Sequence, residues 1–306
     1  MEKTESINVK ESSSSNKNKS KYVLEFITEK IFMISAFVAV ISLLLIIGFV
    51  FYKGLMPFAT EGYSFIDFIF GTEWLPSSKE FGIGAMIVTS MVATVGALII
   101  GVPIGILAAI FIAEICPKKY ARVISTAVEL LAGIPSVLYG IFGLAVIVPA
   151  IQTVLNLPKG QSLLAVIIVL AIMMLPTIIS LSETSIRAVP KSYKEGSLAL
   201  GASKIETIFK VTVPAAKSGI LAGVILGIGR ALGETMAVIL VAGNSTAMPT
   251  SLLDSARPLT TNIALEMGYA AGTHQNMLFA TGVVLFIFII IINLVLTKLT
   301  SKGVDR

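Results

Sequence analysis

The chain has 306 residues, of which 55% are hydrophobic and only 13% charged, and its formal net charge is +5. Its mean hydropathy is +0.91. Because soluble domains carry about 25% charged residues, this composition excludes an ordinary soluble enzyme and indicates an integral membrane protein. The positive charge does not predict nucleic-acid binding, since basic residues in a membrane protein mark its cytoplasmic loops.

The N-terminal part of the chain changes abruptly from polar to apolar. Residues 1–25 include the run ESSSSNKNKSK, which cannot bury enough apolar surface to fold, so we expect a disordered cytoplasmic tail. Residues 31–52 then provide 22 positions without a charge. At 1.5 Å per residue this run is about 33 Å long, enough to cross a bilayer. Residues 26–80 are therefore predicted to hold a first transmembrane helix and an outer loop.

The outer loop, residues 54–80, mixes aromatic and acidic side chains. This mixture favours an amphipathic segment at the outer membrane interface, and a docking surface for an external partner is the alternative. Five further apolar segments follow, and each is long enough to cross the membrane. They are residues 81–112, 127–150, 162–181, 218–243 and 276–297.

The Lys and Arg residues set the orientation of these six spans. With the N-terminus inside, the inner segments 1–30, 114–122, 182–217 and 298–306 hold 6, 3, 6 and 3 of the 23 basic residues. Positive charge collects on the cytoplasmic side of membrane proteins. The predicted fold class is therefore an all-α integral membrane protein with six transmembrane helices and cytoplasmic N- and C-termini.

The fifth segment contains two charges, Arg230 and Glu234, near its centre. A charge at that depth costs about 2.5–3.5 kcal/mol, so such residues usually face a bundle interior or a wet cavity. Four residues apart on a helix, the two side chains are expected to share a face and to pair. In one interpretation Arg230 attracts an oxyanion on a permeation path while Glu234 orients it. In the other, the pair is structural and holds two helices together.

Other side chains in the apolar segments also suggest roles. Glu129, early in the third segment, either faces the path or snorkels to the inner interface. Gly219, Gly223 and Gly227 recur at four-residue spacing, which predicts close helix packing. Prolines within apolar segments predict helix breaks. They are Pro103, Pro135 and Pro176.

The long inner segment 182–217 carries a helical pattern. Leu198, Ala202, Ile205 and Phe209 are spaced by three and four residues, as on one face of a short helix that Gly201 interrupts. Such a loop either binds a cytoplasmic partner or lies on the membrane surface.

Part of this segment resembles the EAA loop of ABC importer permeases. Glu195, Gly196 and Ser197 stand where that pattern has Glu-Ala-Ala. Gly201 and Pro214 stand at the spacing of its glycine and final proline, and Val-x-Val replaces Ile-x-Leu before the proline. In that family the loop forms the coupling helix that docks in a groove of the ATPase subunit.

Three further stretches resemble PstC-type permeases of the bacterial phosphate importer. They are ELLAGIPSVLYG (129–140), GRALGETMAV (229–238) and NIALEMGYAAGTH (262–274). The resemblance implies a type I ABC importer permease fold over residues 81–300, with an EAA-like coupling loop at residues 190–214.

The resemblance also implies a function. A multi-pass subunit of the bacterial cell membrane would form half of a phosphate path, with Arg230, Glu234, Thr235 and Glu129 as path residues. Its partners would be a sister permease subunit in a heterodimer, two ATPase subunits, an external phosphate-binding protein and membrane lipid. The chain has no G-x-x-x-x-G-K-[ST] phosphate loop, so it is not expected to be an enzyme. We expect no cofactor or metal on this chain, with ATP and Mg on the partner ATPase.

Two rival functions remain. A secondary anion carrier would use Arg230 and Glu234 as an ion-coupled relay, but the sequence shows no convincing internal repeat and the EAA-like loop would be unexplained. A membrane scaffold for phosphate signalling is the other rival.

Overall fold

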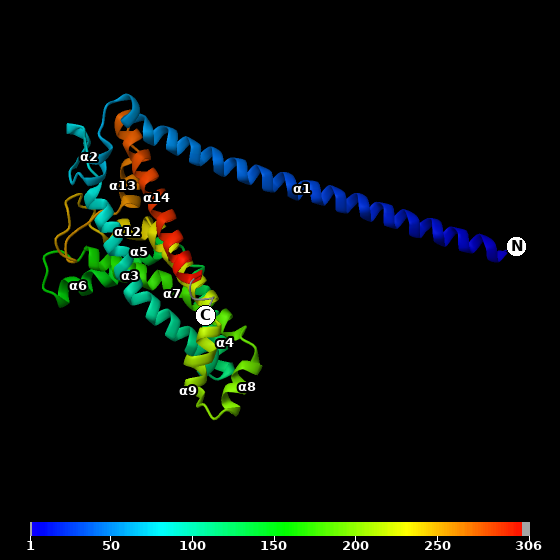
Figure 1. Ribbon diagram of the computed structural model, residues 1–306. Coiled ribbons are helices and arrows are strands. Elements are labelled where there is room, and N and C mark those ends of the chain that lie inside the picture. Colours follow the sequence, from blue (N-terminus) through cyan, green and yellow to red (C-terminus); the bar gives the residue numbers. More distant parts are fainter. Residues whose placement is uncertain (1, 302–306) are drawn as a thin grey trace. The chain divides into compact units, whose positions relative to one another are not determined.

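The computed structural model describes residues 2–301 (Figure 1). Along residues 2–21, 23–24, 296–297 and 299–301 it describes the backbone alone. The C-terminal residues 302–306 of the predicted inner segment lie outside the described residues. The chain divides into two units, Met1–Tyr52 and Lys53–Arg306, and each is described by itself.

The first unit consists of the helix α1, Glu2–Thr60, up to Tyr52. Its portion Glu25–Thr60 is apolar and long enough to cross a membrane, in agreement with the first predicted span. The helix already begins at Glu2, whereas the sequence predicts disorder over residues 1–25. That segment contains no Gly or Pro, so a helix nucleated in the apolar half can extend through it without a second nucleation step.

The second unit is a helical bundle built around α7. This helix has 67% of its most apolar window buried, and both α3 and α11 pack against it. Met173, Met174 and Ile178 are its most deeply buried large side chains. The long helices are α3 (Gly84–Ile110), which continues as the π-helix η2 (Phe111–Ile115), α7 (Leu163–Arg187), α11 (Lys217–Gly233) and α14 (Thr273–Ser301).

Small residues allow α11 to lie close to α7, as predicted. A Cβ on Gly219 would lie 1.9 Å from the Ser185 hydroxyl, and one on Gly223 would lie 3.1 Å from Leu181. Gly227 faces Ile178 in the same way. The predicted close packing is confirmed, and it explains why glycine is required at these positions.

The third span differs from its prediction. The sequence predicts one helix over residues 127–150, but the backbone is broken between Gly133 and Pro135, so the apolar span that follows is Ser136–Val154. Pro135 has no N–H to continue the preceding helix. The helices involved are α4 (Lys118–Ala132), α5 (Ser136–Phe142), the π-helix η3 (Gly143–Ile147) and α6 (Val148–Val154). Breaks predicted at Pro103 and Pro176 do not occur, since α3 and α7 continue past them.

The fifth span is also broken, so the single helix predicted over residues 218–243 is wrong. Helix α11 ends at Gly233, Glu234 is extended with φ −70° and ψ 131°, and α12 (Met236–Val241) follows. The Thr260 hydroxyl donates to the Glu234 carbonyl oxygen over 2.9 Å, which satisfies a group that the break frees.

Five helices within the described residues are long and apolar enough to cross a membrane. A sixth span results when the pair Lys204–Ala215 and Lys217–Gly233, bent by 69°, is taken as one. This matches the predicted number. The fourth span extends beyond residue 181, because α7 continues to Arg187.

The end of the bundle predicted to face the cytoplasm, here called the inner end, carries the EAA-like segment. The interruption predicted at Gly201 is confirmed, because Gly201 turns the chain with φ +86° and separates two helices. The elements are α8 (Lys191–Ala199), α9 (Lys204–Thr207), the π-helix η4 (Ile208–Thr212) and α10 (Val213–Ala215).

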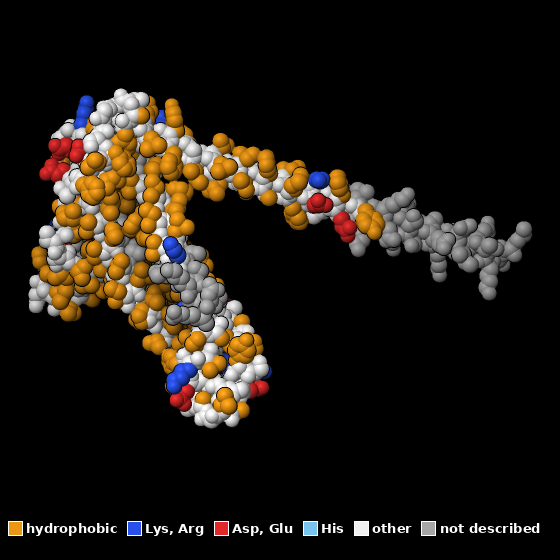
Figure 2. Space-filling view, in the orientation of Figure 1, with side chains coloured by type: hydrophobic (Ala, Val, Ile, Leu, Met, Phe, Trp, Pro, Cys, Tyr) orange, Lys and Arg blue, Asp and Glu red, His pale blue; other side chains and the backbone are white. Residues whose placement is uncertain are grey.

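The opposite, outer end has a small folded layer. Its aromatic residues Phe68, Trp74 and Phe81 are buried, so they form a core rather than a lipid anchor. Trp74 pairs with Phe81 across a two-stranded antiparallel sheet. The elements are α2 (Phe65–Phe70), β1 (Trp74–Leu75), the 3₁₀-helix η1 (Pro76–Ser78), β2 (Glu80–Phe81) and α13 (Leu259–Glu266). Figure 2 shows hydrophobic side chains over most of the bundle between these two ends.

Candidate substrate path and coupling surface

The two broken spans lie against each other. Helix α5 packs on α12, and a Cβ on Gly140 would lie 2.7 Å from the Ala237 Cα atom. Only glycine allows this approach, because an added Cβ would overlap the α12 backbone. Two of the stretches singled out in the sequence, residues 129–140 and 229–238, therefore meet where both helices are interrupted.

Arg230 lies at this meeting point, in the last turn of α11. Its charge interacts with the Tyr139 hydroxyl, which itself donates to the Leu131 carbonyl oxygen over 2.7 Å at the end of α4. The guanidinium makes no hydrogen bond or ion pair within the part of the chain that the structure describes. It is half-buried, between the exposed residues Leu226 and Gly233 of the same helix face. Its donors are therefore available to a ligand.

Glu234 does not pair with Arg230, so the predicted ion pair is wrong. The helix ends between them, and the Glu234 Oε1 atom instead accepts the Ala237 N–H over 3.0 Å. A carboxylate in this position satisfies a free donor at the start of α12 and interacts favourably with its dipole. Thr235 donates to the Gly233 carbonyl oxygen over 3.3 Å. Glu234 and Thr235 thus shape the break itself.

A small hollow with hydroxyl groups adjoins the break. Ser90, Thr94 and Thr260 line it together with Glu234, and the Leu259 N–H donates to the Ser90 hydroxyl over 3.0 Å. Sequence reasoning missed Ser90 and Thr94. Their four-residue spacing inside an apolar helix was the available signal, since hydroxyls on one helix face point the same way.

Glu129 is placed differently from the other candidates. It lies on α4 before the break, rather than inside the third span, and it is exposed. No ion pair joins it to Arg230 among the described side chains. Its role in the path stays a prediction.

The EAA-like residues form an exposed surface at the inner end. Glu195, Gly196 and Ser197 lie on α8, which buries none of its residues. The hydroxyl oxygens of Ser197 and Thr207 are 3.0 Å apart, and this contact joins α8 to α9. The apolar side chains Tyr193, Leu198, Leu200, Ile205 and Phe209 are all exposed here, Leu200 to 91%. Pro214 is the second residue of the short α10, which precedes α11.

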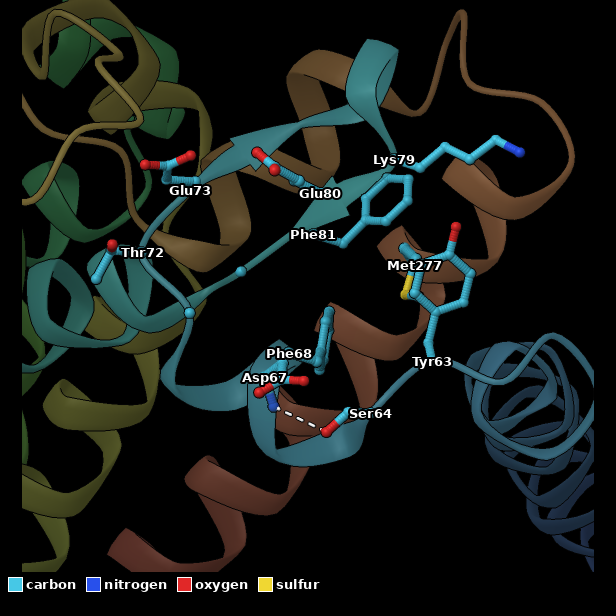
Figure 3. Close-up of a pocket in the computed structure, with 12 residues that line it drawn as sticks. Tyr63, Ser64, Asp67, Phe68, Thr72, Glu73, Lys79, Glu80, Phe81 and Met277 are labelled. Atoms are coloured by element: carbon cyan, nitrogen blue, oxygen red, sulfur yellow. Dashed lines mark hydrogen bonds between the residues drawn. The ribbon is translucent and has the colours of Figure 1, made fainter.

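The outer end has a pocket of about 430 Å³ (Figure 3). Asp67, Glu73 and Glu80 line it, and the Lys79 side chain extends away from them. Three carboxylates repel an anion, so this pocket is a poor candidate for an oxyanion site.

A buried charge cluster holds the outer layer together. Glu266 is 6% exposed, and its carboxylate contacts Arg257 at 2.7 Å, the Trp74 indole N–H at 2.8 Å and His274 at 2.8 Å. Sequence reasoning did not assign these residues, although Glu266 and His274 belong to the singled-out stretch 262–274. Their arrangement indicates that this stretch is structural.

Comparison with known proteins identifies the family. The family model described as binding-protein-dependent transport system inner membrane component matches residues 101–305. The probable ABC transporter permease protein YqgH of Bacillus subtilis (strain 168) is 42% identical over 254 residues, which cover 82% of each chain. The chain belongs to this family of transport permeases. Another relative of this permease, the phosphate transport system permease protein PstC of Mesorhizobium japonicum, is 36% identical over 290 residues, or 87% of this chain and 88% of the relative.

Solved structures show the same fold for the permease. A chain of a bacterial ABC transporter that imports alginate superposes with a TM-score of 0.56 at 15% identity, over 86% of this chain and 95% of that one. A chain of the MetNI methionine ABC transporter superposes with a TM-score of 0.54 at 19% identity, over 72% of this chain and 94% of that one. The predicted type I importer permease fold is confirmed, and the protein is a multi-pass permease subunit of an ABC importer.

Proposed function

We propose that this permease is one of two membrane subunits of an ATP-driven phosphate importer. Support for phosphate comes from relatives whose names state phosphate transport, among them PstC of Mesorhizobium japonicum at 36% identity and PstC of Pasteurella multocida at 34%. The observation that carries the proposal is Arg230. It stands without an ion pair among the described residues, where two interrupted helices meet.

Arg230 suits a phosphate ion in transit. Its guanidinium offers a fixed fork of donors that matches two phosphate oxygens. Because no acidic side chain among the described residues pairs with it, its full charge would act on a passing anion. Glu234 turns its carboxylate to the α12 backbone instead, which keeps the site open. A single arginine gives weak binding, and weak binding permits release.

The path is completed by a second permease subunit in this proposal. The α11 face with Leu226, Arg230 and Gly233 has no covering element within the described residues. A sister subunit would bring a corresponding face, so that the path lies between the two chains. Thr235 at the break and Glu129 on α4 are proposed to line the same path.

Energy would come from two ATPase subunits, which would bind ATP and Mg. The chain has no phosphate loop of its own, so we assign it no ATP hydrolysis. The exposed apolar residues around Leu200 would dock on an ATPase subunit, and the turn at Gly201 would set their position. An external phosphate-binding protein would deliver the ion at the outer end. ATP binding would close the ATPase dimer, the loop around Glu195–Pro214 would transmit that motion, and the path would reopen on the other side of the membrane.

Arg230→Gln tests this proposal. We expect the variant complex to assemble and hydrolyse ATP but to lose uptake of radiolabelled phosphate into proteoliposomes loaded with ATP. Lys159→Gln is the matched control, because it removes an exposed basic residue from a loop away from both breaks, and it should keep normal uptake. Normal uptake by an assembled Arg230→Gln complex would contradict the role of Arg230.

A further inference from the structure

One ion pair connects the EAA-like segment to a membrane-spanning helix. Lys194 on α8 pairs with Glu114 on η2, the continuation of α3, and their side chains are only 25% and 12% exposed. Helix α8 also packs on α9 and η4, which belong to the same inner segment. The ion pair therefore gives α8 a direct polar contact with the end of α3.

A second set of contacts joins η2 to α7 and α4. The Arg187 Nη2 atom on α7 donates to the Ile112 carbonyl oxygen over 3.1 Å, and its Nε atom donates to Glu183 over 2.8 Å. The Ser125 hydroxyl on α4 contacts both Glu183 carboxylate oxygens, at 2.8 and 2.9 Å. Glu183, at the centre of this network, is 8% exposed, whereas the Arg187 side chain is 44% exposed. The network fixes η2 to α4 and α7, while Lys194 fixes it to α8.

The backbone of η2 suits a connection through which a movement of α8 reaches α3. It is a π-helix, closed by the Cys116 N–H donating to the Phe111 carbonyl oxygen over 2.8 Å. Such turns are wider than an α-helix and often occur at functional sites. The helix that η2 ends, α3, also carries Ser90 and Thr94, which line the hollow beside Glu234. A shift of α8 would thus reach the interrupted fifth span through α3.

We propose that Glu114 and Lys194 are positioning residues that transmit the movement of α8 to α3. The proposal rests on the function proposed above, because it requires an ATPase subunit docked on α8. Neither residue needs to touch phosphate or ATP. Their pair is largely removed from water, so solvent and salt screen it less than a surface pair.

Charge removal and charge exchange test this role in the reconstituted full complex. We expect Glu114→Gln and Lys194→Met each to lower the phosphate imported per ATP hydrolysed by about twofold to thirtyfold, the range found for residues that couple distant sites. The ATPase subunit should still co-purify. The exchanged variant, Glu114→Lys with Lys194→Glu, should recover most of the ratio, because it restores opposite charges.

The pair Lys210–Glu206 supplies the matched control. It lies in the same inner segment, spans 3.5 Å and is exposed to 75% and 50%, so Lys210→Met should leave the ratio unchanged. Unchanged ratios in both single variants, or an assembled exchanged variant without recovery, would overturn the proposal. Loss of the ATPase subunit from the single variants would show a merely structural role and overturn it too. A wild-type complex that hydrolyses ATP without importing phosphate would contradict the proposed function instead.

Discussion

At the residue scale, Glu266 shows how the outer layer is stabilised. Its carboxylate accepts hydrogen bonds from Trp74 and Arg257 and contacts His274, and it is buried. Burying a charge is costly unless it is paired, and removing one partner leaves the other unpaired. This cluster joins β1, α13 and the start of α14, so it fixes the outer ends of several elements together.

Glu266→Gln should therefore lower the free energy of unfolding by about 3–5 kcal/mol, because it leaves the Arg257 charge buried without its partner. Unfolding can be followed by intrinsic fluorescence, since Trp74 is the only tryptophan and contacts Glu266 directly. Glu61→Gln, at an exposed carboxylate of the same end, should change it by less than about 0.5 kcal/mol. Equal effects of the two substitutions would argue against a stabilising cluster.

The two charged residues of the fifth span, Arg230 and Glu234, differ in how far the sequence alone predicts their environment. Arg230 was predicted because a charge in an apolar run is costly, and this argument needs only the run itself. The pairing with Glu234 could not be judged in the same way. The helix ends at Gly233, and the break is supported by the Thr260 hydroxyl, which lies 26 residues further along the chain. The local spacing of apolar residues carries no information about a contact between residues so far apart in the sequence.

At the element scale, the turn between α8 and α9 depends on one glycine. Gly201 has φ +86°, and a Cβ there would meet no neighbouring atom within 4 Å. The requirement is therefore conformational rather than steric. A residue other than glycine costs about 1–2 kcal/mol in this left-handed region, although asparagine is tolerated better.

Gly201→Val should accordingly reduce ATP-driven uptake while ATP hydrolysis continues, because the docking residues around Leu200 lose their position. Gly201→Asn should keep most of the uptake. Gly196→Ala, at an open helical position in α8, should be neutral or slightly stabilising. Parallel measurements of phosphate uptake and ATP hydrolysis distinguish these three variants. Full coupling in Gly201→Val would show that the turn conformation is dispensable.

The number of spans was predictable, but their ends and interruptions were not. Hydropathy and the distribution of basic residues depend on local composition. The helix breaks in the third and fifth spans therefore do not change the number of spans that they predict. Pro135 ends a helix, whereas Pro103 and Pro176 do not, because the outcome depends on what the neighbouring helices supply. In the inner segment, by contrast, the interruption at Gly201 is predicted from the sequence, because glycine readily adopts the positive φ that ends a helix.

At the scale of the whole molecule, the permease has its two candidate functional regions at different depths. Arg230 and the helix breaks lie between the two ends of the bundle, and the EAA-like surface lies at the inner end. Helix α3 is shared by both regions, since it borders the hollow at Ser90 and reaches α8 through Glu114. This arrangement suits a subunit in which a distant ATPase controls access to a path.

In the proposed function, this permease carries phosphate across the membrane at the expense of ATP. The most direct measurement is uptake of radiolabelled phosphate by proteoliposomes that contain the chain with its co-purified subunits, with ATP inside and the phosphate-binding protein outside. We predict that phosphate accumulates only when both ATP and the binding protein are present. Accumulation driven by a proton or sodium gradient without ATP would contradict this function and support an ion-coupled carrier.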